Sequence, residues 1–178
     1  MVCAECKNQL PLMEIRSAGI TDIPSIRVLA YDTWPAAYGA ILSQAQLTYM
    51  LELIYSEHAL QEQMSSLAHR FIIITDAGRD VGFASYSQKA NAAKGIFRLH
   101  KLYVLPDQQG KGTGKKLLDY LIADISRENA EALELNVNRN NKAFDFYKKM
   151  GFDISREEDI DIGAGYFMND YVMTKLLK

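Results

Sequence analysis

Apolar residues recur along this chain in two spacings, one typical of strands and one typical of helices. Residues 71–75 and 81–86 are apolar, strand-prone runs separated by turn residues at 76–80, so they predict a β-hairpin. Other segments of strand character are predicted at 13–16, 97–105, 132–137, 152–160 and 165–175. Helical spacing of apolar residues predicts helices over 21–34, 43–54, 57–67, 115–127 and 142–150.

Capping and breaking residues set the expected ends of the first helices. Thr21 offers a hydroxyl cap, and Pro24 is suited to the first turn. Trp34-Pro35 is expected to end that helix, because a proline disfavours helical geometry at the residue before it. Ser43 is expected to cap the second helix.

The order of these elements predicts an α/β (α+β) fold. Counting the strands gives a mixed central sheet of about seven strands with helices on both faces. We expect residues 1–12 to form a flexible N-terminal arm, because they carry no periodic pattern, and residues 13–178 to form a single domain.

Composition and charge change this picture little. A net charge of −2 gives no general attraction to nucleic acid or to anionic membranes. No apolar run approaches the roughly 18 residues of a membrane-spanning helix, so a cytoplasmic protein is expected. Cys3 and Cys6 form a lone Cys-x-x-Cys without a second ligand pair, so reduced thiols are favoured over zinc and no metal site is predicted.

Candidate chemistry is concentrated where the strand ending near residue 105 gives way to a helix. Gly110, Gly112 and Gly114 let the backbone approach a ligand closely, and the first N–H groups of the following helix have no partner within it. Such a helix start attracts phosphate groups. The spacing excludes a Walker A loop, because only three residues separate Gly110 from Gly114, and Lys115 stands where a dinucleotide fingerprint needs glycine.

The segment Gln109-Gly110-Lys111-Gly112-Thr113-Gly114 resembles the Gln/Arg-x-x-Gly-x-Gly/Ala loop of the GNAT superfamily of N-acetyltransferases. A second segment, 138–152, is similar to that family's Asn-x-x-Asn-x-x-Ala-x-x-x-Tyr-x-x-x-Gly-Phe signature, with Ala143 one place early. The resemblance implies acetyl-CoA as the acyl donor and no metal. The residues it implies for binding the cofactor are Leu102, Tyr103, Val104, Gln109, Gly110, Lys111, Gly112, Thr113, Gly114, Lys115, Asn138, Asn141 and Tyr147.

The implied roles fall to main-chain groups and to three side chains, and each of these side chains has a plain structural alternative. Main-chain groups at 102–104 would pair with the pantetheine arm, and those at 109–115 with the pyrophosphate. Asn138 and Asn141 are also favoured helix-capping residues. Tyr147 stands where the family carries the acid that protonates the coenzyme A sulfur, although its spacing also suits a core tyrosine.

The general base is less well marked. Strict strand alternation puts Arg98, His100 and Leu102 on one face, and His100 is the titratable base among them. A structural hydrogen bond is the alternative role for His100. Arg98 stands where some relatives have glutamate, which favours a proton relay through water.

The acceptor is expected to be a primary amine. The last half of the chain looks like the PaiA-type polyamine (spermidine/spermine) acetyltransferases, and acidic residues could line a site for a polyamine. A non-catalytic acyl-CoA-binding regulator and a peptide or protein N-terminal acetyltransferase are the alternatives, and a homodimer is expected from the resemblance. A nucleic-acid partner is disfavoured by the acidic pI. The acidic candidates are Asp32, Glu52, Glu57, Asp159, Asp161 and Asp170.

Overall fold

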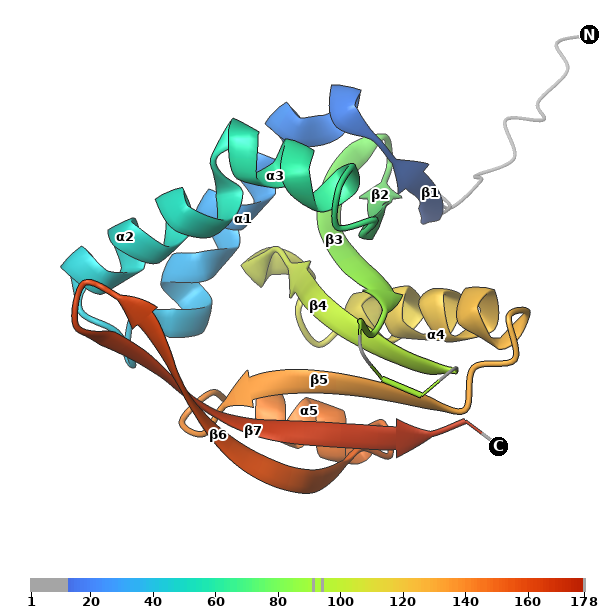
Figure 1. Cartoon of the computed structure of the whole chain (residues 1–178). Coiled ribbons are helices and arrows are strands. Elements are labelled where there is room, and N and C mark those ends of the chain that lie inside the picture. The colour runs from blue at the N-terminus through green and yellow to red at the C-terminus, as the bar shows by residue number, and fades with distance from the viewer. Residues whose placement is uncertain (1–12, 91, 94, 178) are drawn as a thin grey trace, which may run out of the picture.

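The computed structural model describes residues 13–90, 92–93 and 95–177, in which helices surround one twisted sheet (Figure 1). The strands are β1 (Glu14–Ala18), β2 (Arg70–Asp76), β3 (Arg79–Gln88), β4 (Ile96–Val104), β5 (Ala132–Asn138), β6 (Asp153–Gly163) and β7 (Tyr166–Leu176). The helices are α1 (Ile23–Tyr38), α2 (Gln44–Tyr55), α3 (Glu57–Met64), α4 (Thr113–Ser126) and α5 (Ala143–Lys149), with short 3-10 turns at Ile20–Asp22 and Pro106–Gln108.

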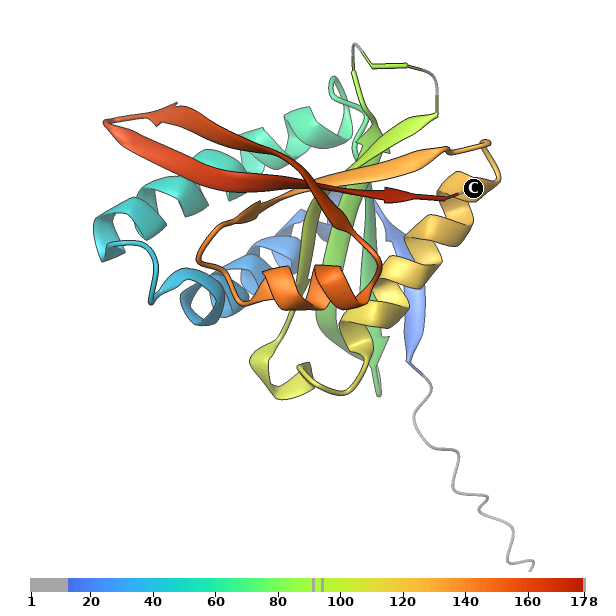
Figure 2. The ribbon, with the colours of Figure 1, turned by 90° about the horizontal axis from the view of Figure 1, so that it is seen from below.

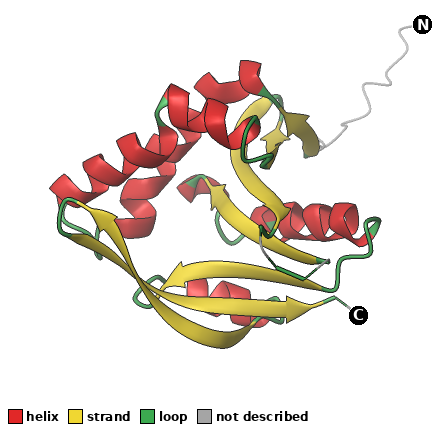
Figure 3. Ribbon diagram, in the orientation of Figure 1, coloured by secondary structure: helices red, strands yellow, loops and turns green. Residues whose placement is uncertain are grey.

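The seven strands form one mixed sheet in the order β1-β2-β3-β4-β5-β7-β6. Neighbouring strands are antiparallel except β4 and β5, which run parallel because α4 connects them (Figure 3). The predicted seven-stranded mixed sheet is therefore confirmed.

Helices cover both faces of this sheet. α1 packs on β3 and β4, whereas α4 packs on β2, β3 and β4 from the other side, and α5 packs on β5. Figure 2 shows α4 and α5 together in front of the strands. The apolar residues of the predicted runs fill the interior, where Ile73, Phe83, Leu117, Leu121 and Phe152 are fully buried.

Two expectations for the first helix are wrong. α1 continues through Pro35 to Tyr38. Pro35 leaves the Tyr31 carbonyl without its helical donor, but both residues lie on the exposed side, where water can serve that carbonyl. Thr21 does not cap α1; Asp22 is the N-cap residue, and its carboxylate accepts a 2.9 Å bond from the Gly19 amide. Pro24 in the first turn and the Ser43 cap of α2 are confirmed.

The C-terminal hairpin of β6 and β7 is longer than predicted and reaches α2 (Figure 1). Its turn, Gly163-Ala164-Gly165, has three consecutive positive φ angles of 88°, 53° and 77°. Two of these positions are glycines, which adopt positive φ without steric strain. The Tyr49 hydroxyl of α2 donates a 2.9 Å bond to the Ile162 carbonyl. This contact holds the hairpin end beside the helices that precede β2.

Some predictions fall outside what the structure describes. The predicted arm at 1–12, with Cys3 and Cys6, lies outside the described residues, and the single domain over 13–178 stays a prediction. Among the described helices, none is both long and apolar enough to cross a membrane.

Candidate active site

The sheet opens between its two parallel strands. β4 and β5 are paired only from Ile96 with Ala132 to Leu99 with Leu135, and beyond this point they diverge (Figure 1). The 102–104 segment keeps its pairing with β3 on one edge, while its other edge has no strand partner within the described sheet. Main-chain donors and acceptors therefore face the opening, as the prediction for Leu102, Tyr103 and Val104 requires.

The glycine-rich loop lies at the mouth of this opening. Gly110 and Gly112 have φ angles of 77° and 81°, and a Cβ added at either would meet no atom within 4 Å. α4 begins directly after Gly112, and its first internal bond runs from the Lys116 amide to the Gly112 carbonyl. The N–H groups of residues 113–115 thus have no partner within the helix, which suits a pyrophosphate.

Gly114 places this helix start against the opening. A Cβ added at Gly114 would lie 3.6 Å from side-chain atoms of Leu102 on β4 and of Phe146 on α5. The loop, the free edge of β4 and α5 are therefore brought close to one another. These are the residues that sequence reasoning assigned to the cofactor, and the bare glycines leave room for it.

Asn138 and Asn141 shape the connection from β5 to α5. Asn138 Oδ1 accepts a 3.0 Å bond from the Asn140 amide, and Asn141 Oδ1 accepts a 2.8 Å bond from the Ala143 amide. Both side chains therefore form the turn that starts α5, the structural alternative noted from sequence. Asn138 also lines the cavity described below, so turn formation leaves a ligand contact open to it.

Tyr147 is buried, with 8% of its surface exposed, and packs edge-on against Phe146 and Phe152 at centroid distances of 5.2 and 5.7 Å. Burial raises the pKa of the Tyr147 hydroxyl well above its ordinary value of 10, and the nearby Tyr38 adds to the rise. The hydroxyl therefore keeps its proton at neutral pH. No hydrogen bond to another described residue uses it, so the proton is available to a ligand in the opening.

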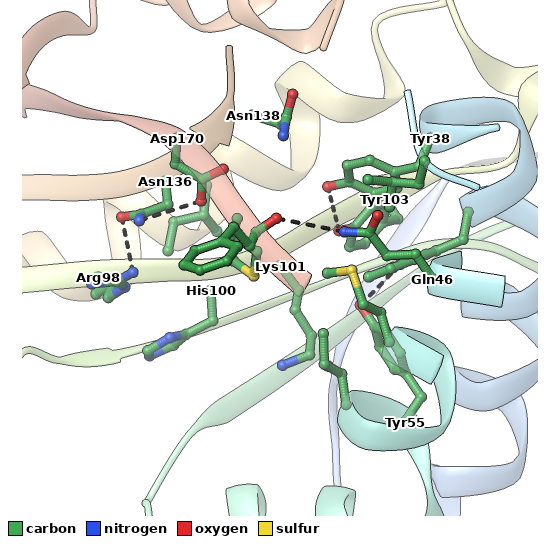
Figure 4. A pocket seen from close by; sticks show the side chains of 17 residues that line it. Tyr38, Gln46, Tyr55, Arg98, His100, Lys101, Tyr103, Asn136, Asn138 and Asp170 are labelled. Atoms are coloured by element: carbon green, nitrogen blue, oxygen red, sulfur yellow. Dashed lines mark hydrogen bonds between the residues drawn. The ribbon is translucent and has the colours of Figure 1, made fainter. Parts of the chain in front are cut away.

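A cavity of about 150 Å³ lies where β4 and β5 have separated (Figure 4). Aromatic side chains of α1, α2 and β4 form one wall, joined by a 3.1 Å contact between the Tyr38 and Tyr103 hydroxyls and a 3.3 Å bond from Trp34 to Tyr55. Phe167 and Met168 of the C-terminal hairpin contribute another side. The polar residues that line it are Gln46, Arg98, His100, Lys101, Asn136, Asn138 and Asp170.

Asp170 is a buried carboxylate in this cavity, with 3% of its surface exposed. Asn136 links it to Arg98: the amide oxygen accepts a 2.9 Å bond from Arg98, and the amide nitrogen donates to Asp170 at 3.4 Å. Burial raises the pKa of the Asp170 carboxyl, against the opposing effects of Asn136 and Arg98. Of the six acidic residues predicted for a cationic acceptor, Asp170 is the one that lines this cavity.

His100 also lines the cavity, but its surroundings are structural in character. Its Nε2 lies 2.9 Å from the Ser87 hydroxyl, and its ring stacks on His69 at 3.8 Å. Burial lowers the pKa of His100 to about 3, and His69, Lys101 and Arg98 contribute to the decrease. The imidazole is therefore neutral at physiological pH and holds a proton weakly.

A β-bulge corrects the predicted alternation of β4. Ser85 pairs with Lys101 and Tyr86 with Leu99, so His100 is the extra residue and the faces exchange beyond it. Arg98, His100 and Leu102 consequently do not share one face. Leu102 points to Gly114 of α4, and the bulge instead turns Lys101 and Tyr103 toward the cavity.

Lys101 is the main feature that sequence reasoning missed. It is 7% exposed, and its ammonium donates a 2.5 Å bond to Gln63 Oε1 and lies 5.6 Å from the ring centres of Tyr55 and Phe71. Burial lowers the pKa of Lys101 to about 7. An apolar setting for a lysine on a central strand was the available signal, but the bulge concealed its direction.

Comparison with known proteins identifies the family. The family model for the acetyltransferase (GNAT) domain matches residues 41–169. A spermidine N(1)-acetyltransferase of Thermoplasma acidophilum is 30% identical over 161 residues, covering 88% of this chain and 95% of that protein. An L-methionine sulfoximine/L-methionine sulfone acetyltransferase of Pseudomonas aeruginosa is 26% identical over 145 residues, covering 79% of this chain and 80% of that protein.

Solved structures agree with this assignment. The crystal structure of PaiA N-acetyltransferase from Thermoplasma acidophilum in complex with coenzyme A matches with a TM-score of 0.77 and 26% identity, covering 93% of this chain and 99% of that chain. Among the described residues, no group of His, Cys, Asp or Glu is arranged to hold a metal ion. With the opened sheet and the glycine loop, these matches establish that the chain belongs to the GNAT family of N-acetyltransferases, enzymes with acetyl-CoA as acyl donor.

Proposed function

We propose that this protein transfers an acetyl group from acetyl-CoA to the primary amine of a small molecule, by direct attack within a ternary complex. The observation that carries the proposal is the cavity between the separated strands, where the buried carboxylate of Asp170 lies beside the opening that the glycine loop borders. A carboxylate in this position can hold an ammonium group and accept its proton.

The cofactor roles in this proposal belong mostly to the main chain. The N–H groups from Gln109 through Lys115 bind the pyrophosphate, and the free edge at Leu102, Tyr103 and Val104 binds the pantetheine amides. Asn138, which lines the cavity, and Asn141, in the turn before α5, are the side chains assigned to the cofactor. The support is the local geometry: two glycines with positive φ, amides at the start of α4 that have no partner within the helix, and a strand edge without a partner in the described part of the sheet.

Acetyl transfer forms a C–N bond and breaks the C–S bond, so one proton must leave the amine and one must reach the sulfur. Asp170 takes the proton of the bound ammonium, directly or through water. Proton transfer is favoured because the raised pKa of the Asp170 carboxyl lies closer to the pKa of an amine. Tyr147 donates its hydroxyl proton to the departing thiolate and regains one from the nitrogen through solvent. His100 lines the cavity, and its role as base stays a prediction.

The family does not fix the acceptor, because the relatives compared above are named for spermidine and for methionine derivatives. A polyamine acceptor is supported by the first of these names and by Asp170. The small volume of the cavity favours a small amine over a peptide or protein N-terminus. A cytoplasmic location and a homodimer stay predictions, which cell fractionation and sedimentation would test.

The test is thiol release from acetyl-CoA with a panel of primary amines, comparing the wild type with Tyr147→Phe. Loss of the acid is expected to lower kcat by roughly 10²- to 10⁴-fold while coenzyme A binding is unchanged. Tyr120→Phe is the matched control, because Tyr120 is 40% exposed on α4. Unchanged turnover in Tyr147→Phe would remove Tyr147 from the mechanism. Binding of acetyl-CoA without any turnover would instead favour an acyl-CoA-binding regulator.

A further inference from the structure

Lys101 is a buried cation whose charge no described carboxylate neutralises. No salt bridge among the described residues includes it, and its hydrogen-bond partner is the neutral amide of Gln63. That amide has a fixed orientation, because its nitrogen donates a 2.9 Å bond to the Ile54 carbonyl. Lys101 lines the acceptor cavity, and its ammonium has two further N–H donors without a partner among the described residues.

Among the described residues that line the cavity, Lys101 is a basic side chain without an acidic partner. Arg98 and Asp170 are coupled through Asn136, whose amide nitrogen also donates to Glu158, so these two carboxylates already share a guanidinium. His100 is neutral. Lys101 has no carboxylate partner among the described residues, and a buried ammonium is costly unless an ion of opposite sign accompanies it.

We propose that the acceptor carries a carboxylate that pairs with Lys101 while its amine lies toward Asp170, so that it is an amino acid or similar amino-carboxylate rather than a polyamine. The inference rests on the proposed function and names its substrate class. In the protein alone, burial lowers the pKa of Lys101 to about 7, and a carboxylate in contact would raise it again and hold the charge.

Figure 4 shows Asp170 and the Lys101 ammonium on different sides of the cavity. An acceptor that meets both must therefore extend across it, which makes the separation of amine and carboxylate a second criterion of selectivity. A triply charged polyamine would place further cations against Arg98 and Lys101. Repulsion between these like charges disfavours it in a buried site.

The test uses pairs of amines that differ only by the carboxylate: leucine with isopentylamine, 4-aminobutyrate with propylamine, and 6-aminohexanoate with pentylamine, together with spermidine. Charge-assisted hydrogen bonds of the usual strength predict that, in at least one pair, the carboxylate raises kcat/KM by roughly 10- to 100-fold. In Lys101→Met the KM of the amino-carboxylate should rise until this preference is lost. Lys149→Met, on the exposed surface of α5, should keep it.

The outcomes separate the two proposals. Turnover of spermidine or the simple amines as fast as every carboxylate partner would overturn the carboxylate inference and leave the proposed function standing. Absence of turnover with every amine would overturn the proposed function itself. If Lys101→Met does not fold, calorimetry of wild-type protein with the acetylated products decides, because N-acetyl-amino-carboxylates should bind at least tenfold more tightly than the matched acetylated amines.

Discussion

Replacing His100 with glutamine should make the protein less sensitive to acid. Glutamine is neutral at every pH and retains a polar group that can reach the Ser87 hydroxyl, which now lies 2.9 Å from His100 Nε2. The histidine itself can be protonated only at a cost, because its ring is largely buried and stacks on His69. The substitution thus removes one titrating group and preserves its hydrogen bond.

The magnitude follows from the two pKa values of His100. The pKa is about 3 in the folded protein and 6.5 in the unfolded chain, so the unfolded state binds the extra proton as the pH falls. The stability that the neutral imidazole contributes is fully present above pH 6.5 and is lost as the pH falls toward 3. At pH 5 the loss is about 2 kcal/mol, out of a total near 5 kcal/mol once the pH is below 3. This is a large part of the 5–15 kcal/mol that typically holds a domain folded.

The measurement is the free energy of unfolding in urea at pH 8, 7, 6 and 5 for the wild type and His100→Gln. Between pH 8 and pH 5 the wild type should lose about 2 kcal/mol more than the variant. His58→Gln is the control, because His58 is exposed on α3 and its replacement should leave the wild-type pH dependence intact. Parallel curves for wild type and His100→Gln would show that the stacked ring titrates normally and would refute the reasoning.

The same variant decides whether His100 acts as the base. With Asp170 as the proton acceptor, His100→Gln should retain kcat/KM within about threefold, whereas loss of a general base typically costs 10²-fold or more. A loss of that size, with unchanged coenzyme A binding, would return the role to His100.

Three further predictions concern the loop and the cavity. Gly112→Ala should weaken coenzyme A binding at least tenfold, measured by calorimetry, because it places a Cβ in the loop. Gly78→Ala is the control: Gly78 has a similar φ of 78° in a remote turn, so the variant has the same backbone strain and should bind coenzyme A normally. Asp170→Asn should lower kcat/KM for amines by roughly 10²-fold without changing cofactor affinity. Glu158→Gln is the control: it alters the other carboxylate bonded to Asn136 and should leave kcat/KM unchanged. Because the folded pKa of Lys101 is about 7 against an ordinary 10.5, its contribution to stability should rise as the pH increases from 7 to 10.5, and urea unfolding of Lys101→Met should lack that rise.

The backbone of the proposed cofactor half could be predicted from the sequence because that half is local. The strand, the glycine turn and the helix start follow one another within about twenty residues, and their binding groups are main-chain atoms whose positions depend on backbone geometry. Glycines with positive φ at 110 and 112 occur where the motif required them. Local pattern and local backbone geometry agree there, while the cofactor contacts themselves stay a prediction.

The acceptor half could not be predicted in the same way, because its residues come from distant parts of the chain. Lys101 and Asp170 lie on β4 and β7 and line one cavity only after the sheet has formed, and Gln63, which bonds to Lys101, lies on α3. The bulge at His100 also reverses which of the following residues face the cavity. A bulge depends on how a strand pairs with its neighbour, and alternation along one strand does not contain that information. Strict alternation therefore directed attention to His100 and away from Lys101.

This division has a consequence for specificity. The cofactor is held by main-chain groups, so side chains there can change with little effect on coenzyme A, whereas the acceptor meets side chains whose charges must balance in a small buried volume. Substituting one of those charges alters the sum by a whole unit in a medium of low polarity, where an unmatched charge is costly. The choice of acceptor should therefore follow the charge of Arg98, Lys101 and Asp170 taken together, and the double variant Lys101→Met/Asp170→Asn should accept neither amino-carboxylates nor polyamines well while still binding coenzyme A.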